Sequence, residues 1–149
     1  LKSRGFYNTL NKLVLIDKVP ILGICLGMQI MAKHGYEIKK SAGLGWLDAE
    51  VVKISPENKL FKVPNIGWES VEFKDSSFLF NSFPKNPEFY FVHSYFMSCF
   101  NLDDITSWYN VDRIKITASI QKENIFGTQF HPEKSSDMGL DILINFINF

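Results

Sequence analysis

Hydrophobic positions follow two different periods along the chain, and the changes of period divide it into helical and extended segments. Apolar side chains at helical spacing in residues 4–17 predict an amphipathic helix, which Pro20 cannot continue. Residues 21–24 form a short apolar run that is typical of a strand buried on both faces. The segment after it, residues 26–33, is expected to form a second helix that ends near Gly35.

The middle of the chain is dominated by extended segments. Apolar residues at 51–54 predict one strand, and clusters of Asn, Asp and Pro separate it from the strands that follow. Four further strands are expected, over residues 66–73, 89–96, 105–110 and 114–121. Residues 138–149 carry an apolar stripe at helical spacing and predict a closing helix, with Ser135 as its N-cap. This order predicts an α/β sheet with an antiparallel extension, and a site at the carboxyl ends of the strands.

The composition is that of one domain with a large core. The chain has 149 residues, of which 46% are hydrophobic and 14 are Phe. Lys plus Arg equals Asp plus Glu, at 16 each, so no basic footprint of nucleic-acid binding is visible. No apolar run approaches the roughly 20 residues of a membrane span, and no signal peptide is visible. We therefore expect neither nucleic acid nor a membrane as a partner.

A cysteine interrupts the passage from the first strand to the second helix. Residues 23–29 have the sequence GICLGMQ, which places Cys25 at a strand-to-helix turn between Gly23 and Gly27. The glycines lack Cβ atoms, so backbone and substrate can come close. The N–H groups of the helix that opens at Leu26 favour the thiolate and can hold a developing oxyanion. A buried structural cysteine is the alternative, which the flanking glycines and the change from strand to helix disfavour.

A histidine and a glutamate stand at the end of a later strand. Residues 123–130 are expected to form a turn and a strand, with His131 at its end and held extended by Pro132. Period-two alternation then puts His131 and Glu133 on one side, where the carboxylate can orient the imidazole. A surface turn that opens the last helix is the alternative interpretation. With Cys25, the pair supplies a nucleophile, a base and an orienting carboxylate, which indicates thiol-based acyl chemistry.

The remaining candidate residues carry less chemistry. His93 lies between apolar neighbours and is interpreted as a core histidine, and His34 as a surface residue at a helix end. The two cysteines and the other histidines lack the short paired spacing of a zinc site, so no metal and no cofactor is expected. A disulfide between Cys25 and Cys99 would consume the nucleophile, and a reducing cytoplasm is favoured. Three aromatic residues are candidates for either the core or an interface, namely Trp46, Trp68 and Phe96.

Taken together, the motifs resemble a known family. Residues 23–29 and 130–133 are similar to the two signature segments of the class I (triad) glutamine amidotransferases. Three further segments resemble the branch of the glutaminase subunit of imidazole glycerol phosphate synthase, namely GLGWL at 43–47, PNIGW at 64–68 and YFVHSY at 90–95. The likeness runs from about Lys18 to the C-terminus. It implies a flavodoxin-like α/β fold, with a mostly parallel central sheet flanked by helices and an antiparallel extension.

The resemblance also implies a role for each matching residue. Cys25 resembles the nucleophile that attacks the side-chain amide of glutamine, releases ammonia and leaves a glutamyl thioester. His131 resembles the general base and acid, and Glu133 its orienting partner. Four residues match positions that bind the substrate: Leu26 through its oxyanion N–H, Gln29, and the backbone of Ser94 and Tyr95. In the family the ammonia passes to a (β/α)₈-barrel cyclase subunit, the partner in a heterodimer.

Two departures from the family pattern keep alternatives open. Asn65 and Glu69 replace a histidine and an asparagine near the partner face, so a paralogue that supplies ammonia for sugar amination or amidination in surface-polysaccharide synthesis is the alternative. The chain starts at Leu1 without the Gly-rich segment that supplies the second oxyanion donor in relatives. Residues 1–149 are therefore expected to be an amidotransferase domain without its N-terminal portion, with low or no glutaminase activity alone. A hydrolase of γ-glutamyl amides and a non-catalytic binding partner are the remaining alternatives.

Overall fold

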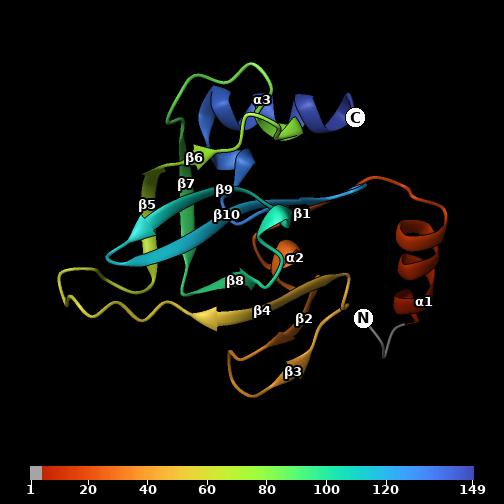
Figure 1. The fold of residues 1–149 in the computed structure, drawn as a ribbon, viewed down its shortest axis with the longest axis horizontal. Helices are drawn as coiled ribbons and strands as arrows, with labels where there is room; N and C mark the ends of the chain where they lie inside the picture. The colour runs from red at the N-terminus through yellow and green to blue at the C-terminus, as the bar shows by residue number, and fades with distance from the viewer. Residues whose placement is uncertain (1–4) are drawn as a thin grey trace.

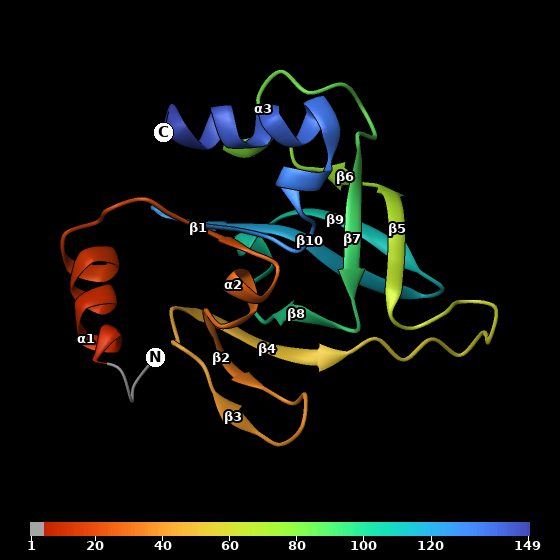
Figure 2. The ribbon, with the colours of Figure 1, turned by 180° about the vertical axis from the view of Figure 1, so that it is seen from behind.

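The computed structural model describes residues 5–149, which form mixed sheets flanked by helices (Figure 1). Helix α3 lies on one side of the largest sheet, and α1 and the β5–β7 strand pair lie at opposite ends of the molecule (Figures 1 and 2). The elements in chain order are α1 (Phe6–Asn11), η2 (Lys12–Ile16), β1 (Ile21–Ile24), α2 (Leu26–Gln29), β2 (Ala32–Gly35), β3 (Ser41–Ala42), β4 (Leu47–Lys53), β5 (Asn65–Ser70), β6 (Glu72–Phe73), η3 (Phe78–Phe80), β7 (Glu88–His93), β8 (Tyr95–Cys99), η4 (Leu102–Asp104), β9 (Ile105–Val111), β10 (Ile114–Lys122), β11 (Ile125–Thr128), η5 (Pro132–Lys134) and α3 (Ser136–Ile147).

The strands form sheets with the orders β1-β11-β10-β9-β6, β3-β2-β4-β8 and β5-β7. The expected α/β class is confirmed, but within residues 5–149 the sheets are mixed instead of mostly parallel. Strand β1 runs parallel to β11 and β2 runs parallel to β4, whereas the other pairs are antiparallel. Short connections between strands explain the antiparallel pairs. Only two residues join β9 to β10, for example, and a link of that length can connect only antiparallel strands.

The core consists of two hydrophobic clusters on the two sides of the β1-containing sheet. One cluster is rich in phenylalanine and includes Ile142 of α3. In it Phe89 stacks on Phe130 with a centroid distance of 4.1 Å, which anchors the segment that enters His131. The other cluster contains Met28 of α2. The two catalytic candidates are thus each attached to a well-packed core.

The segment after Cys25 differs from its prediction. The helix expected over residues 26–33 ends at Gln29, and Ala32–Gly35 form the strand β2. Strand β2 gains partners on both edges, β4 and β3, and the backbone hydrogen bonds of this pairing compensate for the loss of helical ones. His34, expected at a helix end, therefore lies in β2, with its ring 3.8 Å from a carboxylate oxygen of Glu50.

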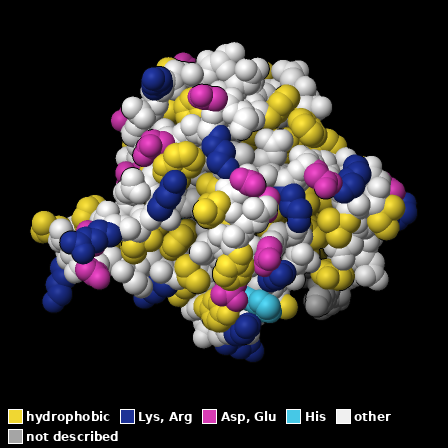
Figure 3. All heavy atoms as spheres, in the orientation of Figure 1, with side chains coloured by type: hydrophobic (Ala, Val, Ile, Leu, Met, Phe, Trp, Pro, Cys, Tyr) yellow, Lys and Arg dark blue, Asp and Glu magenta, His cyan; other side chains and the backbone are white. Residues whose placement is uncertain are grey.

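The surface carries both signs of charge. Figure 3 shows acidic and basic side chains interspersed on one face. In the described part of the chain, no helix has the length and apolar composition needed to cross a membrane.

Candidate active site

The nucleophile candidate lies where β1 turns into α2, as the sequence predicts. The backbone of Cys25 has φ 50° and ψ −106°, a conformation that a non-glycine residue adopts only where its surroundings enforce it. The Cys25 N–H donates to the carbonyl of Thr128 over 2.7 Å, and this bond continues the parallel pairing of β1 with β11. The strained turn therefore projects the thiol from the carboxyl end of the strand pair.

Two glycines let α2 lie directly on this strand pair. A Cβ at Gly23 would come within 2.6 Å of the backbone of Gly27, and a Cβ at Gly127 within 2.7 Å of the Met28 side chain. The expected close approach of backbones therefore occurs at Gly23. At Gly27 itself a Cβ would meet nothing within 4 Å, so that glycine leaves open space beside the turn.

The base candidate is paired with its carboxylate. The Nδ1 atom of His131 lies 2.7 Å from Oε1 of Glu133, and the His131 side chain is 18% exposed. The sequence analysis predicted this pairing from strand alternation, and that reason was wrong, because β11 ends at Thr128 and Pro132–Lys134 form a 3₁₀ turn. That turn, not strand alternation, brings the carboxylate back to the ring.

Ser135 fixes the backbone of this turn. It stands at the N-cap position of α3, but its side chain makes no capping bond to the helix, which corrects the predicted role. Its hydroxyl donates to the carbonyl of His131 over 2.7 Å and accepts from the Tyr90 N–H at 3.0 Å. The His131 N–H donates to the Tyr90 carbonyl, also at 3.0 Å. Strand β7 thus holds the histidine in place from the side.

The cysteine and histidine segments leave the same edge of the sheet, since Ile24 and Thr128 are partners in the β1–β11 register. Gln129 Nε2 donates to Cys25 Sγ over 3.5 Å, and within residues 5–149 the structure gives the thiol no hydrogen bond to the His131 ring. Catalytic hydrogen bonds are often long or unformed before a substrate binds.

The environment of the thiol differs from the sequence expectation of a favoured thiolate. Burial raises the pKa of Cys25 above its ordinary value, the Leu26 N–H lowers it, and the charge of Glu133 raises it again. The net direction is upward, because α2 has only four residues and its end contributes less than desolvation costs. The thiol therefore needs a base.

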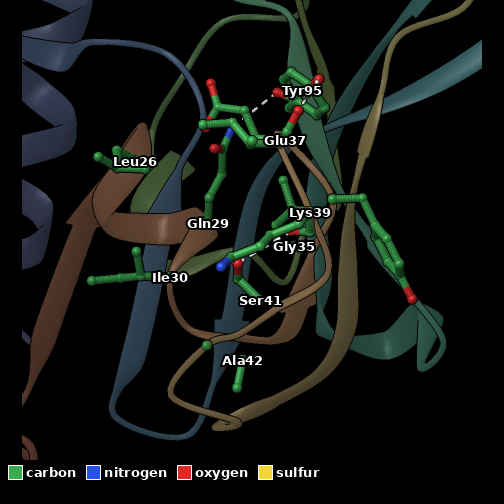
Figure 4. Close-up of a pocket in the computed structure, with 13 residues that line it drawn as sticks. Leu26, Gln29, Ile30, Gly35, Glu37, Lys39, Ser41, Ala42 and Tyr95 are labelled. Atoms are coloured by element: carbon green, nitrogen blue, oxygen red, sulfur yellow. Dashed lines mark hydrogen bonds between the residues drawn. The ribbon is translucent and has the colours of Figure 1, made fainter. Parts of the chain in front are cut away.

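A pocket of about 240 Å³ opens next to α2, and Leu26, the residue after Cys25, is part of its lining (Figure 4). It is lined by residues from α2, from β2 and the loop that follows it, and from β3, β4 and β8, including the predicted binding residues Leu26, Gln29 and Tyr95. The predicted Ser94 does not line it, and the Ser94 carbonyl accepts the Ile54 N–H at 2.9 Å. Three of the four predicted binding residues thus surround one space.

Gln29 is oriented by its neighbours. Its Nε2 atom donates to the Tyr95 carbonyl over 2.8 Å and to Oε1 of Gln129 over 2.9 Å. An amide nitrogen has two hydrogens, so both are used and the carbonyl oxygen of Gln29 remains as an acceptor.

Two residues of the site escaped the sequence analysis. Gln129 is fully buried and joins Gln29 to Cys25, and its signal was a polar side chain within a buried strand end. Glu37 lines the pocket near Gln29 and Tyr95 (Figure 4), and its carbonyl accepts the Tyr95 hydroxyl at 2.9 Å. No sequence signal marked Glu37, because it lies in the loop that follows β2, where the sequence predicted the end of a helix.

Comparisons with known proteins identify relatives of this chain. Residues 3–148 match the family model described as glutamine amidotransferase class-I. The chain is 44% identical over 147 residues to imidazole glycerol phosphate synthase subunit HisH 1 of Campylobacter jejuni (strain RM1221), covering 99% of this chain and 72% of that protein. It is 42% identical over 144 residues to the HisH subunit of Pelagibacter ubique, covering 97% and 69%.

A solved structure shares the fold. A putative GMP synthase component from Thermoplasma acidophilum superposes with a TM-score of 0.67 at 25% identity. The superposition covers 95% of this chain and 62% of that one.

Proposed function

The chain belongs to the class-I glutamine amidotransferase family, and from this premise we propose that it is the glutaminase subunit of an imidazole glycerol phosphate synthase. Its reaction is the hydrolysis of glutamine to glutamate and ammonia. The observation that carries the proposal is the strained Cys25 turn beside the His131–Glu133 pair, at the end of one parallel strand pair. The likeness to HisH subunits over nearly the whole chain supports the pathway.

The first half-reaction uses three side chains. His131 takes the proton from the Cys25 thiol, whose raised pKa otherwise keeps it protonated, and the sulfur attacks the side-chain amide carbon of glutamine. Glu133 stabilises the imidazolium that forms. When the C–N bond breaks, His131 returns the proton to the nitrogen, which leaves as ammonia. The product on the enzyme is a γ-glutamyl thioester.

The second half-reaction repeats the proton transfers with water. His131 takes a proton from a water molecule, which attacks the thioester carbon, and the proton returns to Cys25 as the C–S bond breaks. Glutamate then leaves. In both halves the Leu26 N–H stabilises the negative charge that develops on the carbonyl oxygen.

The pocket supplies contacts for the amino-acid end of glutamine. The free carbonyl oxygen of Gln29 accepts an N–H donor of the substrate, and the Glu37 carboxylate attracts its ammonium group. The pocket volume of about 240 Å³ can hold one amino acid.

The ammonia passes to a (β/α)₈-barrel cyclase, with which the chain forms a heterodimer. The exposed face of β5 supports a partner surface, since Ile66 is 60% and Trp68 50% exposed, whereas Trp46 and Phe96 are buried. The cytoplasm is the proposed location, because both cysteines are free thiols.

The test is glutamate release from glutamine by the complete gene product, with and without a histidine-pathway cyclase barrel and its ribonucleotide. Strong stimulation by the cyclase, lost in Cys25→Ala, is the expected result. Activity that is indifferent to the cyclase would keep the triad and contradict the pathway. No glutamate release under any condition would contradict the glutaminase itself.

A further inference from the structure

A histidine outside the triad joins the substrate pocket to the core. His93, at the end of β7, is only 6% exposed. Its Nδ1 atom lies 2.8 Å from the Tyr95 carbonyl, and its Nε2 atom lies 2.8 Å from the Tyr109 hydroxyl. Asn65 Nδ2 reaches the same hydroxyl at 2.9 Å. Both ring nitrogens of His93 therefore have hydrogen-bond partners, Tyr95 on β8 and Tyr109 on β9, and Asn65 on β5 bonds to Tyr109.

The partners determine where the ring proton is. A backbone carbonyl can only accept, so Nδ1 of His93 must carry the hydrogen. Burial lowers the pKa of His93 to about 4, so the ring is neutral and Nε2 is an acceptor. The Tyr109 hydroxyl then donates to Nε2, and its oxygen accepts from Asn65. Burial also raises the pKa of Tyr109, which keeps this donor protonated.

Further hydrogen bonds connect this set to the nucleophile. The Tyr95 carbonyl accepts from His93 and from Gln29, and the second Gln29 hydrogen goes to Gln129. Gln129 in turn donates to the Cys25 sulfur. One set of hydrogen bonds thus runs from Asn65 on β5 to the thiol.

We propose that Tyr109 is a positioning residue for the substrate, because its hydroxyl donates to Nε2 of His93 and so holds the ring whose Nδ1–H bonds the Tyr95 carbonyl beside Gln29. The other tautomer would place two acceptors, Nδ1 and the Tyr95 oxygen, 2.8 Å apart. The Tyr95 carbonyl therefore requires the Nδ1–H tautomer, and the Tyr109 hydroxyl stabilises this tautomer by donating to the acceptor Nε2. The assignment of glutamine as the ligand rests on the proposed function.

The variant Tyr109→Phe removes only the hydroxyl. It is expected to raise the glutamine KM of the complete gene product about fivefold, with kcat within about twofold of the parent. The reason is that Gln29 holds the ground state and the transition state alike, and uniform binding appears in KM. Asn65→Ala, at a half-buried position, is expected to raise KM about twofold, because the tyrosine loses its orienting donor.

Ser107→Ala is the matched control. Its hydroxyl lies on the same strand, is fully buried and bonds to the Ser119 hydroxyl at 2.6 Å, outside the set that reaches Cys25. It is expected to lower the melting temperature without changing KM. A merely structural role for Tyr109 would make the two variants behave alike.

A spectroscopic readout is independent of activity. The ¹⁵N shifts of His93 are expected to report Nδ1–H in the parent and in both variants, and the Nε2 shift is expected to move only in Tyr109→Phe, where this acceptor loses its donor. Unchanged shifts and an unchanged KM in Tyr109→Phe would overturn the inference. If Tyr109→Phe does not fold, the glutamine KM and the His93 ¹⁵N shifts of Asn65→Ala test the inference instead. A parent without glutaminase activity would overturn the proposed function, and the shifts alone would then decide whether Tyr109 donates to His93.

Discussion

The two histidines near the site show how differently one side chain can be used. His131 lies at the sheet edge, half-buried, with its ring against the carboxylate of Glu133. His93 lies in the core, between a carbonyl and a phenol. They are close enough for the charge of His131 to add to burial in lowering the pKa of His93.

The different hydrogen-bond partners of the two histidines explain their different roles. A carboxylate stabilises the cationic ring, so a histidine beside it can take up a proton and give it back. A carbonyl and a phenol in a dry surrounding keep the ring neutral and fix one tautomer. One histidine is therefore suited to move protons, and the other is suited to hold its neighbours still.

The largest expected effect separates the two roles. His131→Asn should lower glutaminase turnover of the complete gene product by about a thousandfold, the scale of lost general acid–base catalysis. The rate of Cys25 alkylation by iodoacetamide near neutral pH should also fall, since the buried thiol loses its base. His93→Gln should leave alkylation near the parent rate. Equal losses in both variants would contradict the comparison.

The second effect is on stability and concerns the core histidine. The folded pKa of His93 lies near 4, below its ordinary 6.5, so the unfolded state binds the proton first as the pH falls. The contribution is therefore complete above pH 6.5 and lost as the pH falls toward 4, and it amounts to roughly 3 kcal/mol. Urea unfolding at several pH values should show a steeper loss in the parent than in His93→Gln. Parallel curves would contradict the buried neutral ring.

The third effect concerns the support of the edge histidine. A Cβ at Gly139 of α3 would lie 1.9 Å from the Pro132 carbonyl oxygen, so Gly139→Ala must displace the turn that carries His131 and Glu133. We expect a loss of about 2 kcal/mol in the free energy of unfolding, as in other overpacked cores, despite the better helix propensity of alanine.

The control for this substitution is Gly27→Ala in α2, where a Cβ meets nothing within 4 Å. Its free energy of unfolding should stay within about 0.5 kcal/mol of the parent. Thermal or urea unfolding of both variants measures the difference. A similar stability for both would show that α3 can shift without strain.

The smallest effect is electrostatic and has opposite signs at neighbouring residues. The charge of Glu133 raises the pKa of Cys25, and the charge of Lys134 lowers it. Glu133→Gln should therefore shift the pH profile of Cys25 alkylation to lower pH, and Lys134→Gln to higher pH. Both shifts should stay below about one unit, because neither side chain is deeply buried. Shifts of the same sign would contradict the placement of the two charges.

Local patterns in the sequence predicted much of the fold. The strand at residues 21–24 was found as predicted, and the helix expected over 138–149 was found as Ser136–Ile147, because each has a clear period of its own. The strand β2 was missed, since its extended form depends on pairing with β4 and β3 and not on its own residues.

The site was predictable where chemistry follows a short motif. Cys25, His131 and Glu133 stand in two such motifs, and the structure pairs the last two directly. Gln129 was missed because its partners lie about a hundred residues away in sequence, and the direction of the Cys25 pKa depended on burial that only the fold reveals.

The parallel pairing of β1 with β11 has a consequence for how such a chain can change. The proposed nucleophile and base, Cys25 and His131, follow one pair of adjacent strand ends, although most of the chain lies between them. The intervening segments can therefore be lengthened, exchanged or even cleaved in an exposed loop, such as residues 55–63, without altering the distance between Cys25 and His131. Pocket walls and partner surfaces are built from those segments, so specificity and assembly can diversify while the reacting groups keep their places.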